Sequence, residues 1–176
     1  MKTPQRWYRR HQLFNRNIPP ELVPWLFGVS SLTAKLVELC GDDFNVRVLS
    51  QNWQRMSTEE AAAMGLKHVH SALVREVLLR RKDQPLVYAR TVIPATTVRG
   101  AQRRYANMGS RPLGAMLFAD RTMRREAVQV ARLPAEHAAC LHADCEQEIW
   151  GRRSVFRVAG RPLLVSEYFL PALLAA

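Results

Sequence analysis

Residues 73–79 read Leu-Val-Arg-Glu-Val-Leu-Leu, and residues 163–169 read Leu-Leu-Val-Ser-Glu-Tyr-Phe. Because strand side chains alternate between two faces, each stretch predicts a strand whose apolar face holds one charge, Arg75 or Glu167. The apolar neighbours on those faces are Leu73, Val77 and Leu79, and Leu163, Val165 and Phe169. A buried charge without a partner costs several kcal/mol. One interpretation is a structural ion pair between the two charges. The other is a ligand site, in which Arg75 grips a carboxylate and Glu167 meets the ligand's other end.

The rest of the chain follows an α+β order. Alternating apolar residues predict strands at 44–53, 68–81, 85–93, 122–132, 154–158 and 163–170. Helices are predicted at 21–27 after Pro19-Pro20, at 31–40 before Gly41, at 58–64, and from Thr96 or Thr97 to Met108. Short connections at 82–84 and 159–161 join neighbouring strands, which predicts antiparallel pairs. We therefore expect a single domain over residues 1–176, an α+β fold with a six-stranded antiparallel sheet and helices covering one side.

The charge balance favours anionic partners. The chain has 26 Lys and Arg against 15 Asp and Glu, a formal net charge of +11. Nucleic acid, acidic lipid and small polycarboxylates all fit that charge. The pairs Arg103-Arg104 and Arg124-Arg125 suggest nucleic acid, but they lie in no recognised binding motif with interleaved aromatic residues. We therefore do not expect a nucleic-acid partner.

Compartment signals are mostly negative. Three cysteines in 176 residues do not form a disulfide framework, and residues 1–16 have no apolar run like that of a signal peptide. The most apolar stretch, 163–176, is interrupted by Glu167 and Pro171 and is shorter than the roughly 20 residues of a membrane helix. A cytoplasmic protein that does not span a membrane is the expectation.

Five strings in order along the chain carry a resemblance. They are Val-Arg-Glu-Val-Leu-Leu at 74–79, Ala-Arg-Thr-Val-Ile-Pro at 89–94, Pro-Leu-Gly at 112–114, Trp-Gly-Arg-Arg-Ser at 150–154, and Leu-Leu-Val-Ser-Glu-Tyr-Phe-Leu-Pro at 163–171. Together they resemble the bacterial chorismate pyruvate-lyase family. The resemblance is weaker over the N-terminal helices, where Ser31-Leu32-Thr33 stands at the family's expected place.

The resemblance implies a lyase without a cofactor that splits chorismate into 4-hydroxybenzoate and pyruvate, the first step toward ubiquinone. It also implies a six-stranded antiparallel sheet with helices closing a ligand cavity. By the same resemblance, Arg75 binds the ring carboxylate with backbone amides of Leu32 and Leu113, and Glu167 faces the ring hydroxyl. Arg90 is implied to lie in an adjoining charged region used by substrate or departing product. We expect a monomer whose partners are chorismate and 4-hydroxybenzoate.

The chemistry of the substrate is compatible with these assignments. Chorismate is a dianion, and the fork of an arginine suits a carboxylate better than lysine does. Arg75 and Arg90 can fill the two places. An acid on an apolar face, as at Glu167, can donate a proton or anchor the hydroxyl. The sequence leaves open whether the proton passes through Glu167 or moves within the substrate.

Some residues keep two interpretations. Gly114 permits either a turn or close approach of a ligand. Arg152 and Arg153 alternate in direction, so at most one faces inward, and we assign neither to the site. The segment with His137, Cys140, His142 and Cys145 invites a zinc hypothesis, but its spacing is unusual, and Glu136, Asp144 and Glu146 favour an exposed acidic loop. Cys40, before Gly41, is expected to be a small buried residue at a helix end.

A non-enzymatic alternative stays open. The effector-binding domains of some bacterial transcription regulators share this fold type, and a pocket with Arg75 and Glu167 could bind a small acid without reacting. Such regulators carry an N-terminal winged-helix domain. The roughly 70 residues before Arg75 are too few for that domain and the first sheet elements together.

Overall fold

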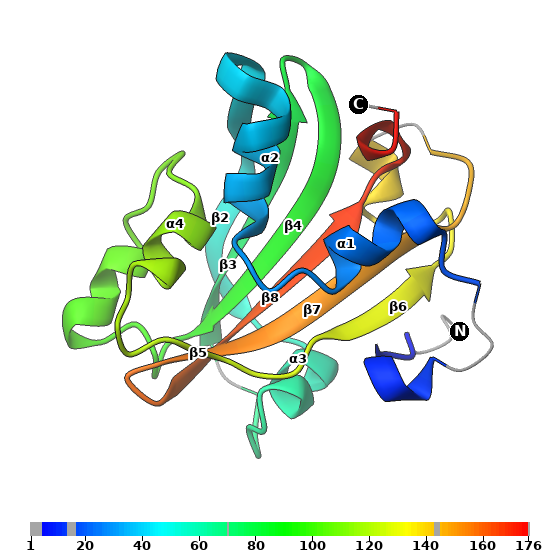
Figure 1. Ribbon diagram of the computed structural model, residues 1–176. Coiled ribbons are helices and arrows are strands. Elements are labelled where there is room, and N and C mark those ends of the chain that lie inside the picture. Colours follow the sequence, from blue (N-terminus) through cyan, green and yellow to red (C-terminus); the bar gives the residue numbers. More distant parts are fainter. Residues whose placement is uncertain (1–4, 14–16, 70, 143–144, 176) are drawn as a thin grey trace.

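An antiparallel sheet forms the centre of the computed structural model, which describes residues 5–13, 17–69, 71–142 and 145–175 (Figure 1). Its order is β1-β6-β7-β8-β4-β3-β2, and β5 pairs with β7 off this path. The strands are β1 Tyr8–Arg9, β2 Phe44–Arg55, β3 Ser71–Arg81, β4 Gln84–Pro94, β5 Arg124–Arg125, β6 Gln129–Leu133, β7 Ile149–Val158 and β8 Arg161–Phe169. The α+β class with an antiparallel sheet is confirmed, whereas the prediction of six strands is wrong, since the sheet has eight.

Two departures account for the strand count. The predicted strand at 122–132 is two strands, β5 and β6, because its pairing with β7 stops after Arg125 opposite Phe156 and resumes one residue out of register at Gln129 opposite Arg153. The other is β1, a two-residue edge strand that pairs with β6 and has no strong sequence signal. The strand predicted from residue 68 begins at Ser71, and His70 lies outside the described residues.

Both predicted hairpins are confirmed. β3 and β4 meet through Lys82-Asp83, with Arg81 opposite Gln84 and a left-handed φ of 53° at Lys82. β7 and β8 meet through Ala159-Gly160, where φ is 49° and 76°. Positive φ at both turn positions is the geometry of a tight two-residue hairpin. This second turn fixes which residues of β7 and β8 face each other.

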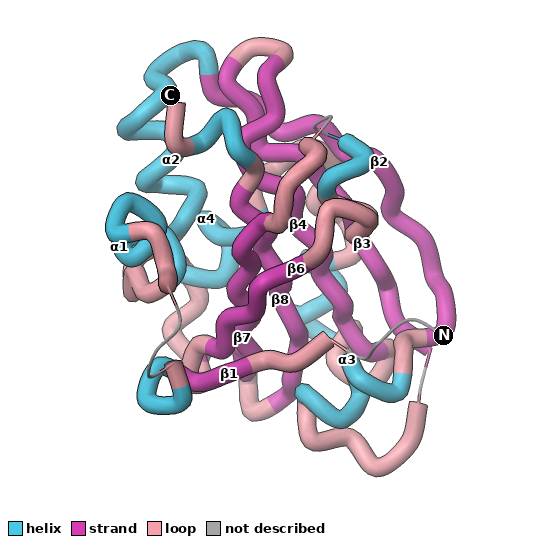
Figure 2. The backbone as a smooth tube through the Cα atoms, turned by 90° about the vertical axis from the view of Figure 1, so that its right-hand side faces the viewer, coloured by secondary structure: helices cyan, strands magenta, loops and turns pink. Residues whose placement is uncertain are grey.

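Helices cover both faces of the sheet (Figure 2). On one face lie α1 Val23–Leu26, α2 Leu32–Cys40 and α4 Leu113–Phe118, and on the other lies α3 Thr58–Ala63. The prediction that helices cover only one side is therefore wrong. A capping box between Ser57 and Glu60 starts α3 directly after β2, and Ala61 packs against Ala72, Val74, Val92 and Leu164 on the opposite face.

The predicted helix from Thr96 or Thr97 to Met108 is also different. Its only regular part is a 3-10 turn over Gly100–Tyr105. The Thr97 hydroxyl donates to the carbonyl of Pro162 at 2.7 Å and so ties this connection to β8 instead of capping a helix. The other 3-10 turns are Arg10–Gln12, Pro20–Leu22, Gly41–Asp43, Cys140–His142 and Pro171–Leu173. Among the described residues, no helix is long and apolar enough to cross a membrane.

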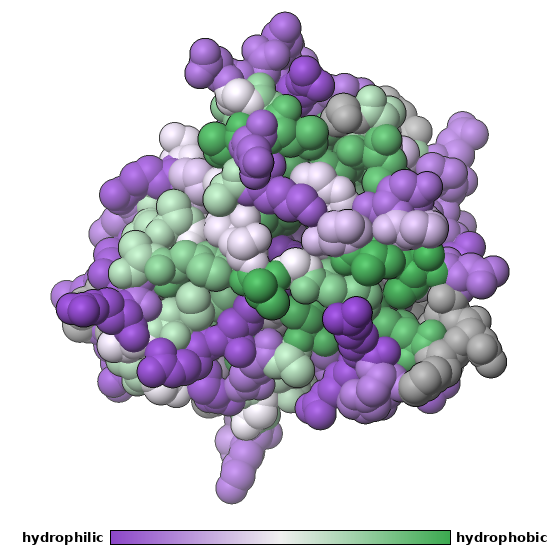
Figure 3. Space-filling model, viewed as in Figure 1, coloured by the Kyte–Doolittle hydropathy of each residue, from purple (hydrophilic) through white to green (hydrophobic). Residues whose placement is uncertain are grey.

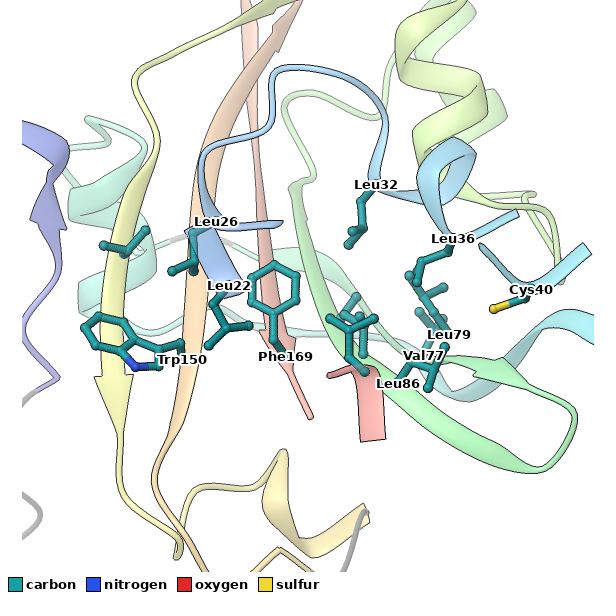
Figure 4. Close-up of a cluster of buried hydrophobic side chains, with 14 residues drawn as sticks. Leu22, Leu26, Leu32, Leu36, Cys40, Val77, Leu79, Leu86, Trp150 and Phe169 are labelled. Carbon is teal, nitrogen blue, oxygen red and sulfur yellow. The ribbon is translucent and has the colours of Figure 1, made fainter. Parts of the chain in front are cut away.

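The core between α1, α2 and the sheet positions the site. Figure 4 shows Leu32 and Leu36 of α2 over Val77 and Leu79 of β3. Leu22 and Leu26 lie in the same way over Trp150 and Phe169. Cys40 is 6% exposed within this cluster, as expected for a helix end. Leucines from both helical segments thus pack against the sheet in this cluster.

Candidate active site

A cavity lies between the sheet and the starts of α2 and α4. Its apolar lining is Val46, Val77, Leu79, Leu117, Phe118, Phe156 and Val165, and its charged lining is Arg75, Arg125, Arg152 and Glu167. Figure 3 views this side of the molecule, where apolar side chains form a band interrupted by polar ones. The sequence-predicted faces are confirmed, because Arg75 and Glu167 share the cavity with their predicted neighbours Val77, Leu79 and Val165.

The hydrogen bonds of Arg75 to the described residues come from one end of its guanidinium group. It is 2% exposed, and its Nη2 donates to the carbonyls of Gly109 at 2.9 Å and Arg111 at 3.3 Å. Its Nε has no hydrogen-bond partner among the described residues. Burial lowers the pKa of Arg75 below its ordinary value. A buried guanidinium that meets carbonyls but no carboxylate is suited to an anionic ligand.

Glu167 pairs with an arginine that the sequence analysis left unassigned. Arg152 Nε donates to Glu167 Oε2 at 2.5 Å, and its Nη1 donates to the carbonyls of Trp25 at 2.7 Å and Gly28 at 3.2 Å. The structural ion pair between Arg75 and Glu167 is therefore the wrong interpretation, since the acid has a different partner.

Arg125 is the third arginine of the cavity. Its Nε donates to Ser154 Oγ at 3.0 Å and its Nη1 to the Gly28 carbonyl at 3.1 Å. Its guanidinium lies 5.4 Å from the ring centre of Phe156. Burial, together with repulsion from Arg152, lowers the pKa of Arg125 to about 10. No salt bridge joins Arg125 to an acid within the described part of the chain.

Leu32 and Leu113 open the two helices at the cavity. Each is the first residue of its helix, and the first amides of a helix have no partner inside it. Leu32 and Leu113 also line the cavity. Gly114 lies in α4 and not in a turn, so that alternative is wrong. A Cβ at Gly114 would stand 2.9 Å from Ser31 Oγ and 3.1 Å from Thr33 Oγ1, so this glycine lets α2 and α4 approach.

Arg90 lies on the other face of the sheet. It neighbours Ala89, which lines the cavity, so alternation sends its side chain away. There it contacts Glu60 Oε1 and Glu76 Oε1, each at 2.9 Å, beside a second hollow. The expectation that Arg75 and Arg90 hold the two carboxylates of one ligand in one cavity is therefore wrong. Its implied role in an adjoining charged region stays a prediction.

Sequence reasoning missed two arginines of the cavity, and one of them, Arg152, had a usable signal. Val158 pairs with Arg161 across the Ala159-Gly160 turn, and counting back from that pair puts Arg152 opposite Glu167. Arg153 faces the other side, where it meets Glu59 at 2.7 Å. For Arg125 no signal existed, because its place depends on the break between β5 and β6.

The segment with His137, Cys140 and His142 does not form a metal site among the described residues. It packs on the face opposite the cavity. The His142 ring stacks on Tyr88 at 5.4 Å and the His137 ring lies 4.6 Å from Tyr168. Glu136 and Glu146 are exposed, as expected for an exposed acidic loop, whereas Cys140 between them is 3% exposed. Asp144 lies outside the described residues.

Comparison with solved structures gives the fold type. The ligand-binding domain of a putative GntR-family transcriptional regulator from Bordetella bronchiseptica is similar, with a TM-score of 0.57 and 18% identity over 74% of this chain and 87% of that one. The C-terminal domain of the histidine utilization repressor from Pseudomonas syringae has a TM-score of 0.59 and 12% identity, over 73% of this chain and 92% of that one. At these identities the likeness concerns the fold alone.

Comparison of sequences gives the family. A probable chorismate pyruvate-lyase from Methylococcus capsulatus is 46% identical over 154 residues, which cover 86% of this chain and 95% of the relative. Proteins of the same description from Azoarcus sp. and Pseudomonas aeruginosa are 42% and 37% identical, over 90% and 95% of this chain and 88% and 92% of theirs. The family model for chorismate lyase matches residues 2–175. The chain belongs to the chorismate lyase family.

Proposed function

We propose that this protein is a chorismate pyruvate-lyase, which converts chorismate to 4-hydroxybenzoate and pyruvate. The observation that carries the proposal is the buried cavity with Arg75 and Glu167 on its sheet wall. Family membership and the names of the relatives support the same activity. The cavity matches the substrate in kind, because chorismate has an apolar ring and two carboxylates.

We infer that Arg75 receives the ring carboxylate. Its unpaired Nε is the buried donor that this carboxylate would satisfy, and a hydrogen bond to a charged group contributes about 1.5–3 kcal/mol. The free backbone amides of Leu32 and Leu113 would support the same carboxylate from α2 and α4. Residues from the sheet and both helices would thus meet on one end of the ligand.

At the other end, Glu167 would accept a hydrogen bond from the ring hydroxyl. The elimination breaks the C–H bond of the carbon that bears this hydroxyl and the neighbouring C–O bond to the enolpyruvyl group. The C–H electrons complete the aromatic ring, and the leaving enolate takes up a proton to give pyruvate. Because Arg152 Nε already donates to Glu167 Oε2, we favour a role in which Glu167 orients the hydroxyl over a role as proton donor.

The remaining parts of the proposal concern context. We propose that the protein is one domain that acts as a cytoplasmic monomer without a cofactor, and that its product supplies ubiquinone synthesis. Arg90 would contact departing product at the hollow across the sheet. These points rest on the family resemblance.

The test is to incubate the purified protein with chorismate and to follow 4-hydroxybenzoate and pyruvate separately. We expect equal amounts of both, and losses of at least tenfold in kcat/KM for Arg75→Ala and Glu167→Ala. Glu167→Gln separates the two roles, because an amide can still orient the hydroxyl but cannot donate a proton as a general acid does. Unchanged chorismate with measurable binding would instead support a non-enzymatic effector-binding module.

A further inference from the structure

We propose that Arg125, beside Arg152, forms the subsite for the enolpyruvyl carboxylate and so makes the site selective for the dianionic substrate over its product. This proposal rests on the lyase function proposed above. Arg125 would be a specificity-determining residue, because it meets a part of the substrate that 4-hydroxybenzoate lacks.

The two arginines converge on one point of the cavity wall. Arg125 Nη1 and Arg152 Nη1 donate to the same carbonyl, that of Gly28, at 3.1 and 3.2 Å. Two cations held at one neutral oxygen repel each other, and this repulsion is relieved when an anion binds between them. Arg152 also forms an ion pair with Glu167, the residue proposed to hold the ring hydroxyl. The enolpyruvyl group is attached to the ring carbon next to that hydroxyl, so its carboxylate would lie near this pair.

The charge count of the cavity agrees with a dianion. Its charged lining is three arginines and one glutamate. Counted by formal charge, the excess of two positive charges equals in magnitude the charge of chorismate and exceeds that of 4-hydroxybenzoate. Arg75 can account for one carboxylate only, because it lies on β3 while Arg125 lies on β5, and three strands, β4, β8 and β7, separate the two.

Arg125 is also built into the wall and does not swing freely. Ser154 Oγ fixes its Nε and the Phe156 ring lies against its guanidinium. The neighbouring Arg124 is exposed, and among the described residues its side chain donates to the carbonyls of Arg121 and Met123 alone. Two arginines adjacent in sequence therefore differ in the one property at issue, access to the cavity, which makes Arg124 a matched control.

The experiment compares Arg125→Gln and Arg124→Gln with the unaltered protein. It measures kcat/KM for chorismate and, by calorimetry, the Kd of 4-hydroxybenzoate and of chorismate at low temperature. We expect Arg125→Gln to weaken the binding of chorismate by about tenfold or more, which corresponds to the loss of one charged hydrogen bond. The Kd of 4-hydroxybenzoate should change much less. Arg124→Gln should match the unaltered protein, and Arg125→Lys should recover part of the loss.

Two results would overturn the proposal. One is an equal loss of affinity for both ligands in Arg125→Gln, which would indicate a structural role. The other is an unchanged affinity for chorismate. If Arg125→Gln does not fold, Arg125→Lys supplies the same ratio of the two affinities. Failure of the lyase function would be visible separately, as intact chorismate with the unaltered protein. The ratio of the two Kd values would still decide whether Arg125 selects the second carboxylate.

Discussion

The two faces of the sheet use the same residue type in opposite ways. Toward the cavity, Arg75 is buried and Arg125 is partly buried, both against carbonyls or a hydroxyl, and neither has a salt-bridge partner among the described residues. On the other face, Arg90 contacts two carboxylates and Arg153 contacts Glu59. These four arginines, which lie on four different strands, thus belong to two electrostatic regimes. Arg90 and Arg153, which carboxylates match, serve the fold, whereas Arg75 and Arg125 are available to a ligand.

The largest expected effect contrasts the two kinds of arginine directly. Arg90→Met strands Glu60 and Glu76, whose side chains are 14% and 27% exposed. Breaking a buried pair costs about 3–5 kcal/mol, and we expect about 2–4 kcal/mol here because of this partial exposure. Arg75→Met removes no carboxylate's partner, so its free energy of unfolding should change by about 1 kcal/mol or less.

Denaturant unfolding of both variants measures the difference in stability. The kcat/KM for chorismate measures the difference in substrate binding. Arg75→Met should lose substrate binding while it stays folded, and Arg90→Met should lose stability with a smaller change in KM. If Arg75→Met were the less stable variant, its guanidinium would be a structural element, and the distinction between the two faces would fail.

Acid should destabilise the protein through the face opposite the cavity. Burial opposes ionisation of Glu60 and Glu76, but hydrogen bonds from Arg90 and neighbouring groups outweigh it and lower the pKa of both below 4.5. A carboxyl with a lowered pKa in the folded state contributes stability above its unfolded pKa and loses it as the pH falls through the folded value.

We therefore expect the free energy of unfolding to fall as the pH drops below about 5. The fall should be shallower in Arg90→Met, where the pKa of both acids moves back up, and the effect should be smaller than the loss from that substitution at neutral pH. Urea unfolding at a series of pH values measures it. Parallel curves for the two proteins would show that the acid sensitivity arises elsewhere.

The features that could be predicted from the sequence are those that depend on contacts between residues close together along the chain. Alternation within β3 and β8 was enough to place Arg75 and Glu167 on one buried face, because strand geometry is local. The partner of Glu167 required a register across two strands, which the Ala159-Gly160 turn encodes but which a shorter predicted strand, starting at Ser154, concealed.

The features that could not be predicted depend on distant contacts. The six residues of α4, Leu113–Phe118, have no capping signal and follow a proline, so only packing against α2 makes them a helix. Arg125 reaches the cavity through a register break beside β7. The placement of α3 on the far face is decided by the direction in which β2 ends. None of these is visible in the periodicity of a single segment.

The smallest expected effect tests the closure that distinguishes the cavity face from the open hollow behind it. Gly114→Ala would press a methyl group on Ser31 and Thr33, at 2.9 and 3.1 Å from their hydroxyls, so α2 and α4 must separate slightly. Alanine favours a helix over glycine by about 1 kcal/mol, which offsets the strain, and stability should change little. Release of 4-hydroxybenzoate, followed by stopped-flow displacement, should quicken a few-fold, whereas the exposed control Ala115→Ser should leave it unchanged. An unaltered release rate would mean that product leaves by a route that does not pass between these helices.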